Sequence, residues 1–203
     1  TYIAVANGVL DPSNFEGAPG TIGFGIDVFA PAQQTSTNAG EVSILVHHGA
    51  TDAPTVDVVN DADQSILVDD ISYTEFAGYL DLPLQDYTIN VEAADNSVVV
   101  QSYEAPLQTL GLADAAVTVV ASGFLDPSAN QSGEAFGLWL ALPAGGDLVP
   151  LPEVQDDTAE VQLIHNSADP AAQFVDIYLD DVLIADDFEF RTASAFLEVP
   201  AET

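Results

Sequence analysis

The sequence predicts an all-β protein built from tandem β-sandwich repeats, and three observations lead to this prediction. Apolar and polar residues alternate in short runs, of which Tyr87–Ala93 is the clearest, and this period of two is typical of a strand with one buried face. Turns rich in Gly, Pro, Asn and Asp separate the runs at even spacing. An internal repeat of about 116 residues holds eight such runs, the number expected of an immunoglobulin-like or Greek-key sandwich.

The expected strands of the central repeat share this alternation and are bounded by turn residues. In chain order they are Val42–His48, Thr55–Val59, Ser65–Val68, Phe76–Leu80, Tyr87–Ala93, Ser97–Tyr103, Val117–Ser122 and Phe136–Leu142. The run Leu138–Leu142 is apolar at every position. We therefore expect it to be either a central strand buried on both faces or a strand that packs against a neighbouring domain. No run has the 3.6-residue period of a helix.

Two long matches define the repeat. Residues Asn7–Ser13 match Ser122–Ser128 at an offset of 115, and Asp70–Pro83 aligns without gaps to Asp187–Pro200 at an offset of 117. A domain-sized period indicates an array of similar units.

The predicted organisation follows from these matches. Residues 1–40 are the C-terminal part of one repeat plus a linker, 41–150 a complete repeat, 151–158 a linker with two Pro residues and an acidic run, and 159–203 the N-terminal part of the next repeat. Because both ends fall inside a repeat, we expect the chain to be a piece of a longer polypeptide.

The charge balance excludes several classes of partner. Among 203 residues there are 33 acidic side chains and a single basic one, Arg191, which gives a formal net charge of −32. Nucleic acids and anionic membrane surfaces require clustered Lys and Arg, so neither is expected as a partner. Hydrophobic residues make up 48% of the chain, which indicates a cored globular protein and not a disordered acidic tail. The apolar runs are too short for a membrane-spanning helix.

The dense carboxylate surface has three interpretations. By the first the protein comes from a halophilic source, because such a surface stays hydrated and repulsive at high salt, and by the second it is part of a surface layer that collects divalent cations. By the third it is an ordinary acidic secreted protein.

The head of the central repeat carries a recognisable pattern. An apolar strand ends at His48, a short loop follows through Asp52 and Pro54, and Val56-Asp57-Val58 begins the next strand. Further on come Gly78-Tyr-Leu-Asp-Leu-Pro83 and Asp86-Tyr-Thr-Ile-Asn-Val91. In combination these segments resemble the prokaryotic cell-surface repeat family catalogued as domain of unknown function 4397. The second copy departs from the pattern, with Gln173 and Phe174 inserted before Val175-Asp176.

The resemblance implies an extracellular β-sandwich that occurs in tandem in large secreted or surface-anchored proteins of bacteria and archaea. It supplies no catalytic residues.

The residues themselves predict no catalytic site and no cofactor, so the chain is not expected to be an enzyme. There is no Cys, which excludes disulfides and thiolate metal sites, and no nucleophile elbow, P-loop or dinucleotide fingerprint is present. The three His residues are His47, His48 and His165. His48 and His165 hold equivalent places in successive repeats, each at a strand end before a tight loop, and we expect each to bridge that loop to the strand by a hydrogen bond.

Paired carboxylates in turns are candidates for calcium, because Ca²⁺ takes oxygen ligands. The candidate metal ligands are Asp61, Asp63, Asp69, Asp70, Asp180 and Asp181. None of them has the spacing of an EF-hand loop, and close pairs arise by chance when one residue in six is acidic. We expect loose condensation of cations on the surface more than a specific calcium site.

These observations favour a structural protein: a segment of an extracellular filament, fibre or surface stalk that self-associates into a homopolymer. Because residues 160–203 and 1–32 are complementary parts of one repeat, strand exchange between neighbours is one way to join the units. The alternative is an extracellular adhesin or carbohydrate-binding module that recognises a surface polysaccharide. Exposure of Tyr2, Tyr73 and Tyr79 on one face would favour that alternative.

Overall fold

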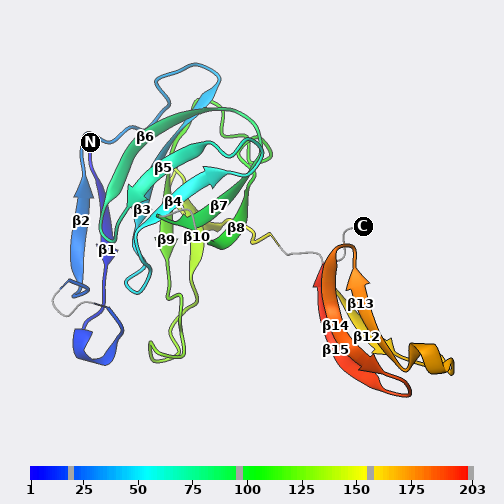
Figure 1. The fold of residues 1–203 in the computed structure, drawn as a ribbon. Helices are drawn as coiled ribbons and strands as arrows, with labels where there is room; N and C mark the ends of the chain where they lie inside the picture. The colour runs from blue at the N-terminus through cyan, green and yellow to red at the C-terminus, as the bar shows by residue number, and fades with distance from the viewer. Residues whose placement is uncertain (18–20, 95–97, 155–157, 201–203) are drawn as a thin grey trace. The chain divides into compact units, whose positions relative to one another are not determined.

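The chain divides into two compact units, Thr1–Val154 and Gln155–Thr203. In the computed structural model, shown in Figure 1, residues 1–17, 21–94, 98–154 and 158–200 are described. Apart from short 3₁₀ turns, the regular structure of both units consists of β-strands, which confirms the predicted all-β class.

The larger unit is a β-sandwich of two sheets (Figure 1). One sheet has five strands in the order β11 (Val149–Pro150), β10 (Gly137–Ala141), β9 (Ala116–Ser122), β3 (Glu41–His48) and β6 (Phe76–Pro83). The other has four strands in the order β5 (Ile66–Ile71), β4 (Val56–Asn60), β7 (Tyr87–Ala93) and β8 (Val99–Ala105). All neighbouring strands are antiparallel except β3 and β9, which are parallel.

The observed strands overlap all eight of the predicted ones, with ends that shift by at most three residues. The largest shifts are in β5, which continues to Ile71 where the sequence predicted an end at Val68, and in β6, which continues to Pro83 where it predicted an end at Leu80. Ser97, the first residue of another predicted strand, lies outside the described residues. Strand ends vary because ladder pairing, and not the local pattern, decides where a strand stops.

Apolar side chains from both sheets form one core. Val42 and Leu140 of the five-stranded sheet and Val58 and Val91 of the four-stranded sheet belong to the same buried cluster. Burial of such side chains stabilises the fold by about 1.5–3 kcal/mol each. The apolar run in β10 is not buried on both faces: Leu138 and Leu140 are buried, whereas Trp139 between them is half-buried. The alternation of a strand with one core face therefore holds even where the sequence lacks polar residues.

The first forty residues pack on this sandwich. Strands β1 (Ile3–Asn7) and β2 (Gly25–Phe29) form a separate two-stranded antiparallel sheet, with the 3₁₀ turn η1 (Pro12–Asn14) between them. Residues 33–40, at the linker end of the predicted segment 1–40, are held to the sandwich. Asp114 accepts hydrogen bonds from the amide of Ser36 (2.8 Å, to its carbonyl) and from that of Gly40 (2.7 Å, to its carboxylate).

The predicted linker 151–158 also begins inside the sandwich. Leu151 is only 4% exposed and belongs to the core cluster. The amide of Val154 donates to the carbonyl of Ser102 at 2.9 Å, and Glu153 forms a bridge with Tyr103. The connection between the units therefore does not start at residue 151, and residues 155–157 lie outside the described part of the chain.

The smaller unit contains two antiparallel strand pairs. They are β12 (Thr158–Ile164) with β15 (Ala193–Pro200), and β13 (Phe174–Leu179) with β14 (Val182–Glu189). The 3₁₀ turn η2 (Pro170–Ala172) precedes β13.

The sequence matches recur as shared strand registers. Asn7 lies opposite Gly25 in the β1–β2 hairpin, and Ser122 lies opposite Gly137 in the β9–β10 hairpin. Residues of β9 therefore match residues of β1 at an offset of 115, and residues of β10 match residues of β2 at an offset of 112. A bridge of parallel type follows each pair, Val9 with Gly23 and Phe124 with Ala135.

The second sequence match, between the segments that contain β3–β6 and β12–β15, also has a shared strand register. Ser43 lies opposite Asp81 in β3–β6, and Glu160 lies opposite Glu198 in β12–β15, an offset of 117 on both sides. Each pair also has a bulge at the same place, before His47 in β3 and before Ile164 in β12. Similar sequence thus produces similar pairing in both matched regions.

Candidate functional site

A buried polar contact in the larger unit joins the N-terminal hairpin to the sandwich. Alternation in β2 turns Asp27 and Phe29 toward the sandwich while Ile26 and Val28 face solvent. The contacting surface belongs to β3 and β6 of the five-stranded sheet, on the side away from the core. We call the contact between the β1–β2 hairpin and β3–β6 the hairpin interface.

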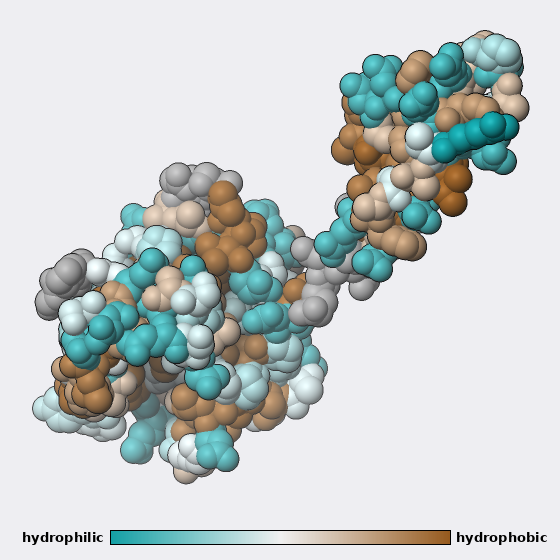
Figure 2. All heavy atoms as spheres, turned by 90° about the horizontal axis from the view of Figure 1, so that it is seen from below, coloured by the Kyte–Doolittle hydropathy of each residue, from teal (hydrophilic) through white to brown (hydrophobic). Residues whose placement is uncertain are grey.

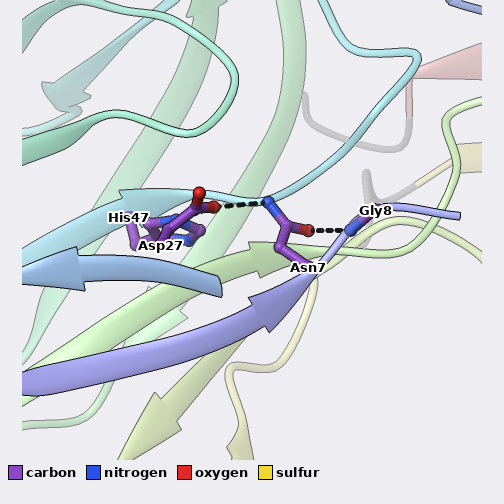
Figure 3. A network of polar contacts seen from close by, with 4 residues as sticks. All are labelled: Asn7, Gly8, Asp27 and His47. Atoms are coloured by element: carbon purple, nitrogen blue, oxygen red, sulfur yellow. Dashed lines mark hydrogen bonds and ion pairs between the residues drawn. The ribbon is translucent and has the colours of Figure 1, made fainter. Parts of the chain in front are cut away.

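His47, Asp27 and Asn7 form the polar centre of the hairpin interface (Figure 3). The ring Nε2 of His47 lies 3.1 Å from Asp27 Oδ2, and the Asn7 side-chain amide donates to the same oxygen at 3.0 Å. Asn7 Oδ1 in turn accepts the amide of Gly8 at 2.9 Å. His47 is fully buried, so this carboxylate bonds to a ring that water does not reach.

Burial sets the charge of the two neighbouring His residues. It lowers the pKa of His47 below its usual value, against the opposing hydrogen bond and negative charge of Asp27. Burial also lowers the pKa of His48, against its hydrogen bond to the Pro54 carbonyl. Both rings are therefore neutral at pH 7, with Nε2–H as the donor to Asp27 in one case and to Pro54 in the other.

Aromatic rings surround the polar centre. The Phe29 ring lies 5.4 Å from that of Phe76 and 5.7 Å from that of Tyr79, the latter edge-on. Phe76 also contacts the His47 ring at 4.3 Å between centroids. The Tyr79 hydroxyl accepts the amide of Gln33 at 2.8 Å, which fastens the segment after β2. Aromatic pairs of this kind contribute about 0.5–1.5 kcal/mol beyond their buried area.

A second set of contacts fixes the loop of the hairpin. Phe15 stacks on Phe124 with ring centroids 5.6 Å apart. Asn130, which is buried, accepts the Glu16 amide at 2.8 Å and donates to Asp52 Oδ2 at 3.0 Å. The N-terminal segment is thus held to the sandwich at the β1–β2 pair and again at residues 15 and 16.

The expected role of His48 and His165 is confirmed. His48 Nε2 lies 3.0 Å from the carbonyl oxygen of Pro54, and His165 Nε2 lies 2.7 Å from that of Ala172. Each ring therefore bridges its strand end to the following loop.

The first four candidate calcium ligands lie in two places. Asp61 and Asp63 are in the β4–β5 turn, where Asp63 Oδ1 accepts from the Ser65 hydroxyl at 2.6 Å and Asp61 Oδ1 accepts from Asn90 at 3.0 Å. The Ser65 hydrogen bonds lower the pKa of Asp63. Asp69 and Asp70 are exposed on β5. Local hydrogen bonds thus occupy the carboxylates in the β4–β5 turn.

The last two candidates, Asp180 and Asp181, form the two-residue turn between β13 and β14, with Asp180 in the left-handed region. The acidic group that the structure brings together is a different one: Asp176, Asp186 and Asp187, with one oxygen of each within 4.8 Å of the others. All three are exposed, and Asp176 Oδ1 accepts the Asp187 amide at 3.0 Å. The negative charge of Asp176, and then that of Asp187, raises the pKa of Asp186.

The three tyrosines that would favour a sugar-binding face do not share one exposure. Tyr2 is exposed, but Tyr73 and Tyr79 are half-buried, and Tyr79 packs inside the hairpin interface. This placement gives the carbohydrate-binding alternative no specific support.

Sequence reasoning missed the pairing of His47 with Asp27. Two signals could have found it: Asp27 is the single acid in the apolar run of β2, and His47 and His48 must point to opposite faces of one strand. In the matched copy both positions change together, to Trp139 in β10 and to Ile164 in β12. The neutral histidine and the aspartate that bond in one copy thus correspond to two hydrophobic residues at the matched positions.

Comparison with known proteins identifies the family. The family model described as "Domain of unknown function (DUF4397)" matches residues 31–132, half of the chain. The chain therefore belongs to this family, as its motifs indicated. The match begins after the β1–β2 hairpin and covers β3 to β9. Searches of curated proteins and of solved structures gave no match to the chain. No helix in the described part of the chain has the length and hydrophobicity needed to cross a membrane.

Proposed function

We propose that this protein is a structural segment of an extracellular filament, fibre or surface stalk in which β-sandwich repeats pack on one another, without catalysis. The observation that carries the proposal is the hairpin interface: a β9–β10-like hairpin, matched in register, lies on the outer face of the following sandwich. In an array of such repeats, this contact would join each unit to the next.

The composition of the interface supports a permanent joint. It combines the buried His47–Asp27 bond with aromatic rings in tilted and edge-on contact. The extracellular placement rests on the family resemblance, in which such repeats occur in secreted and anchored proteins.

The net charge of −32 limits how the units associate. Each unit is anionic, so association has to overcome repulsion that falls as the Debye length shrinks from about 10 Å at 0.1 M salt to about 3 Å at 1 M. Apolar strands or bridging cations would then supply the contact. Assembly that increases with salt or with calcium is the expected behaviour.

Light scattering and negative-stain electron microscopy of the purified chain test the proposal. From 0.1 to 3 M NaCl, with calcium or with EDTA, we expect species many times the 21.2 kDa monomer, larger at higher salt. Monodisperse 21.2 kDa particles under every condition would show that the chain does not form a homopolymer. Unchanged assembly in EDTA and low salt would remove the cation part of the proposal alone.

A further inference from the structure

The β1–β2 hairpin exposes a face that belongs inside a sandwich. On the side away from the hairpin interface, Ile26 is 57% exposed and Val28 56%, and Ala4 and Ala6 are exposed beside them. The shared register places these four residues at the positions of four buried core residues of β9 and β10: Val119, Ala121, Leu138 and Leu140. The hairpin therefore presents to solvent the side chains that a complete repeat buries.

The smaller unit presents the complementary half. Among the described residues β12 pairs with β15 alone, whereas its counterpart β3 lies between β6 and β9. Core positions are also less covered: Val56 and Val58 of β4 are buried, but Val175 and Ile177 of β13 are half-buried. Figure 2 shows hydrophobic residues at the surface of this smaller unit.

We propose that β1 of one copy adds to the open edge of β12 of a second copy, parallel and in the register of β3 with β9. This inference rests on the proposed function, because it names the contact by which copies would join. In the larger unit Val46 lies opposite Val119. Leu163 of β12 matches Val46 at the offset of 117, and Ala4 of β1 matches Val119 at the offset of 115. The same pairing between two copies therefore places Leu163 opposite Ala4. The occupant is thus a second copy of this chain, and the interaction is strand addition.

Two polar contacts of the complete repeat join residues that have counterparts in the smaller unit of one copy and in the β1–β2 hairpin of another. The Gly49 amide donates to the Ala121 carbonyl at 2.9 Å, and the corresponding groups are the Asn166 amide and the Ala6 carbonyl. The complete repeat therefore predicts a hydrogen bond from Asn166 of one copy to Ala6 of the other.

The second contact involves a carboxylate. Asp52 accepts the amides of Leu125 and Asp126, each at 3.0 Å. Its counterpart is Asp169, and the amides that correspond are those of Leu10 and Asp11, with Leu10 88% exposed. Asp169 Oδ1 accepts the Ala171 amide at 2.9 Å, so its second oxygen would hold the turn after β1, as Asp52 holds the turn after β9.

One hairpin can make both contacts at once. The face with Asp27 and Phe29 stays on its own sandwich, while the face with Ile26 and Val28 covers the second copy. Because every copy carries both the hairpin and the β12 edge, the pairing is head-to-tail and continues into a chain of copies.

Disulfide cross-linking tests the register, since the chain has no Cys. An Ala4→Cys chain is mixed with a Leu163→Cys chain in 2 M NaCl and oxidised, and dimers are counted on non-reducing gels. The control replaces Ala4→Cys with Ala6→Cys, two residues out of register, where the Cα atoms would be too far apart for a bridge. We expect at least ten times more cross-linked heterodimer from the Ala4–Leu163 pair. Equal yields from the two pairs would overturn the proposed register.

A charge on the exposed face of the β1–β2 hairpin tests whether this face takes part in assembly. Ile26→Asp should abolish assembly, whereas Ile66→Asp, at an isoleucine on β5 that is 50% exposed against 57% for Ile26, should leave it unchanged. Far-UV circular dichroism of both variants checks that the sandwich is folded. Assembly by wild-type protein together with assembly by Ile26→Asp would overturn the strand addition and leave the filament proposal standing. A wild-type chain that stays monomeric under all salts would overturn both.

Discussion

The β1–β2 and β9–β10 hairpins share one pairing register but differ in what covers them. In β9–β10, Leu138 and Leu140 lie in the core between two sheets. In β1–β2 the residues at the same positions, Ile26 and Val28, face solvent, and the opposite face is the covered one. The comparison shows that a hairpin's own sequence sets its two faces, whereas its neighbours decide which face is buried.

A charge placed at matched positions of the two hairpins should have opposite outcomes. Leu140→Asp puts a carboxylate at a fully buried position of β10 and should lower the free energy of unfolding by about 4 kcal/mol or more. Val28→Asp, at the matched position of β2, should change it by no more than about 0.5 kcal/mol in the monomer at low salt. Urea unfolding followed by the fluorescence of Trp139, the only tryptophan, measures both. Similar losses in the two variants would contradict the assignment of the exposed face.

Gly8 and Gly123 begin the loops of the two hairpins at matched positions. Gly8 and Gly123 have φ values of +85° and +92°, and a Cβ on either would clash with a backbone carbonyl, that of Gly23 or of Ala135. Gly123→Ala should destabilise the sandwich by about 3 kcal/mol, from the left-handed backbone and the clash together.

Gly111→Ala separates the cost of the left-handed backbone from the cost of the clash, and Gly8→Ala shows which strands the loop glycine stabilises. Gly111→Ala has the same kind of backbone but open space around it, so it should lose only about 1–2 kcal/mol. Gly8→Ala should increase hydrogen exchange in β1 and β2 and spare the core strands. Faster exchange throughout the sandwich would mean that the hairpin is part of its folding core.

The His47–Asp27 bond should account for part of the hairpin's attachment. Asp27→Ala leaves a buried ring donor without its acceptor and should weaken the docked state by about 1–3 kcal/mol. Hydrogen exchange by mass spectrometry should show faster exchange in residues 1–30 and unchanged exchange in β7. His47→Ile with Asp27→Trp, the residues of the matched copy, should recover much of the protection. No change in exchange in Asp27→Ala would remove this bond from the attachment.

Acid should weaken the same interface, and the sign follows from the pKa of His47. Burial lowers this pKa in the folded protein, so the unfolded chain binds more protons below the usual His value. The contribution to stability is present above about pH 6.5 and is lost as the pH falls through the folded pKa. Urea unfolding should give a smaller free energy at pH 5.5 than at pH 7.5.

A variant isolates His47 from other titrating groups. His48 shifts in the same direction, so the wild-type slope contains both rings. The slope should be reduced in His47→Gln and reduced further when His48→Gln is added. An identical slope in wild type and His47→Gln would show that another group controls the pH dependence.

Local patterns predicted the strands of the central repeat well. Tyr87–Ala93 was placed at its observed bounds, because its alternation and its flanking turns are properties of adjacent residues. The bridging role of His48 followed from its place at a strand end before a loop. Local patterns did not identify the aspartates that the structure brings together. Asp180 and Asp181 are adjacent in sequence but lie in a turn, while Asp176, Asp186 and Asp187 meet only because β13 pairs with β14.

The sequence by itself determined the all-β class of this protein and the strands of its central segment. These follow from alternation and turn residues, which neighbouring residues express. Only the tertiary structure decided that Asp27 meets His47, that β1–β2 docks with its Asp27 face, and that residues 33–40 and 151–154 belong to the sandwich. The physical reason is that these contacts join different sheets, where the free energy of burial and hydrogen bonding depends on which surfaces meet and not on any local pattern of residues.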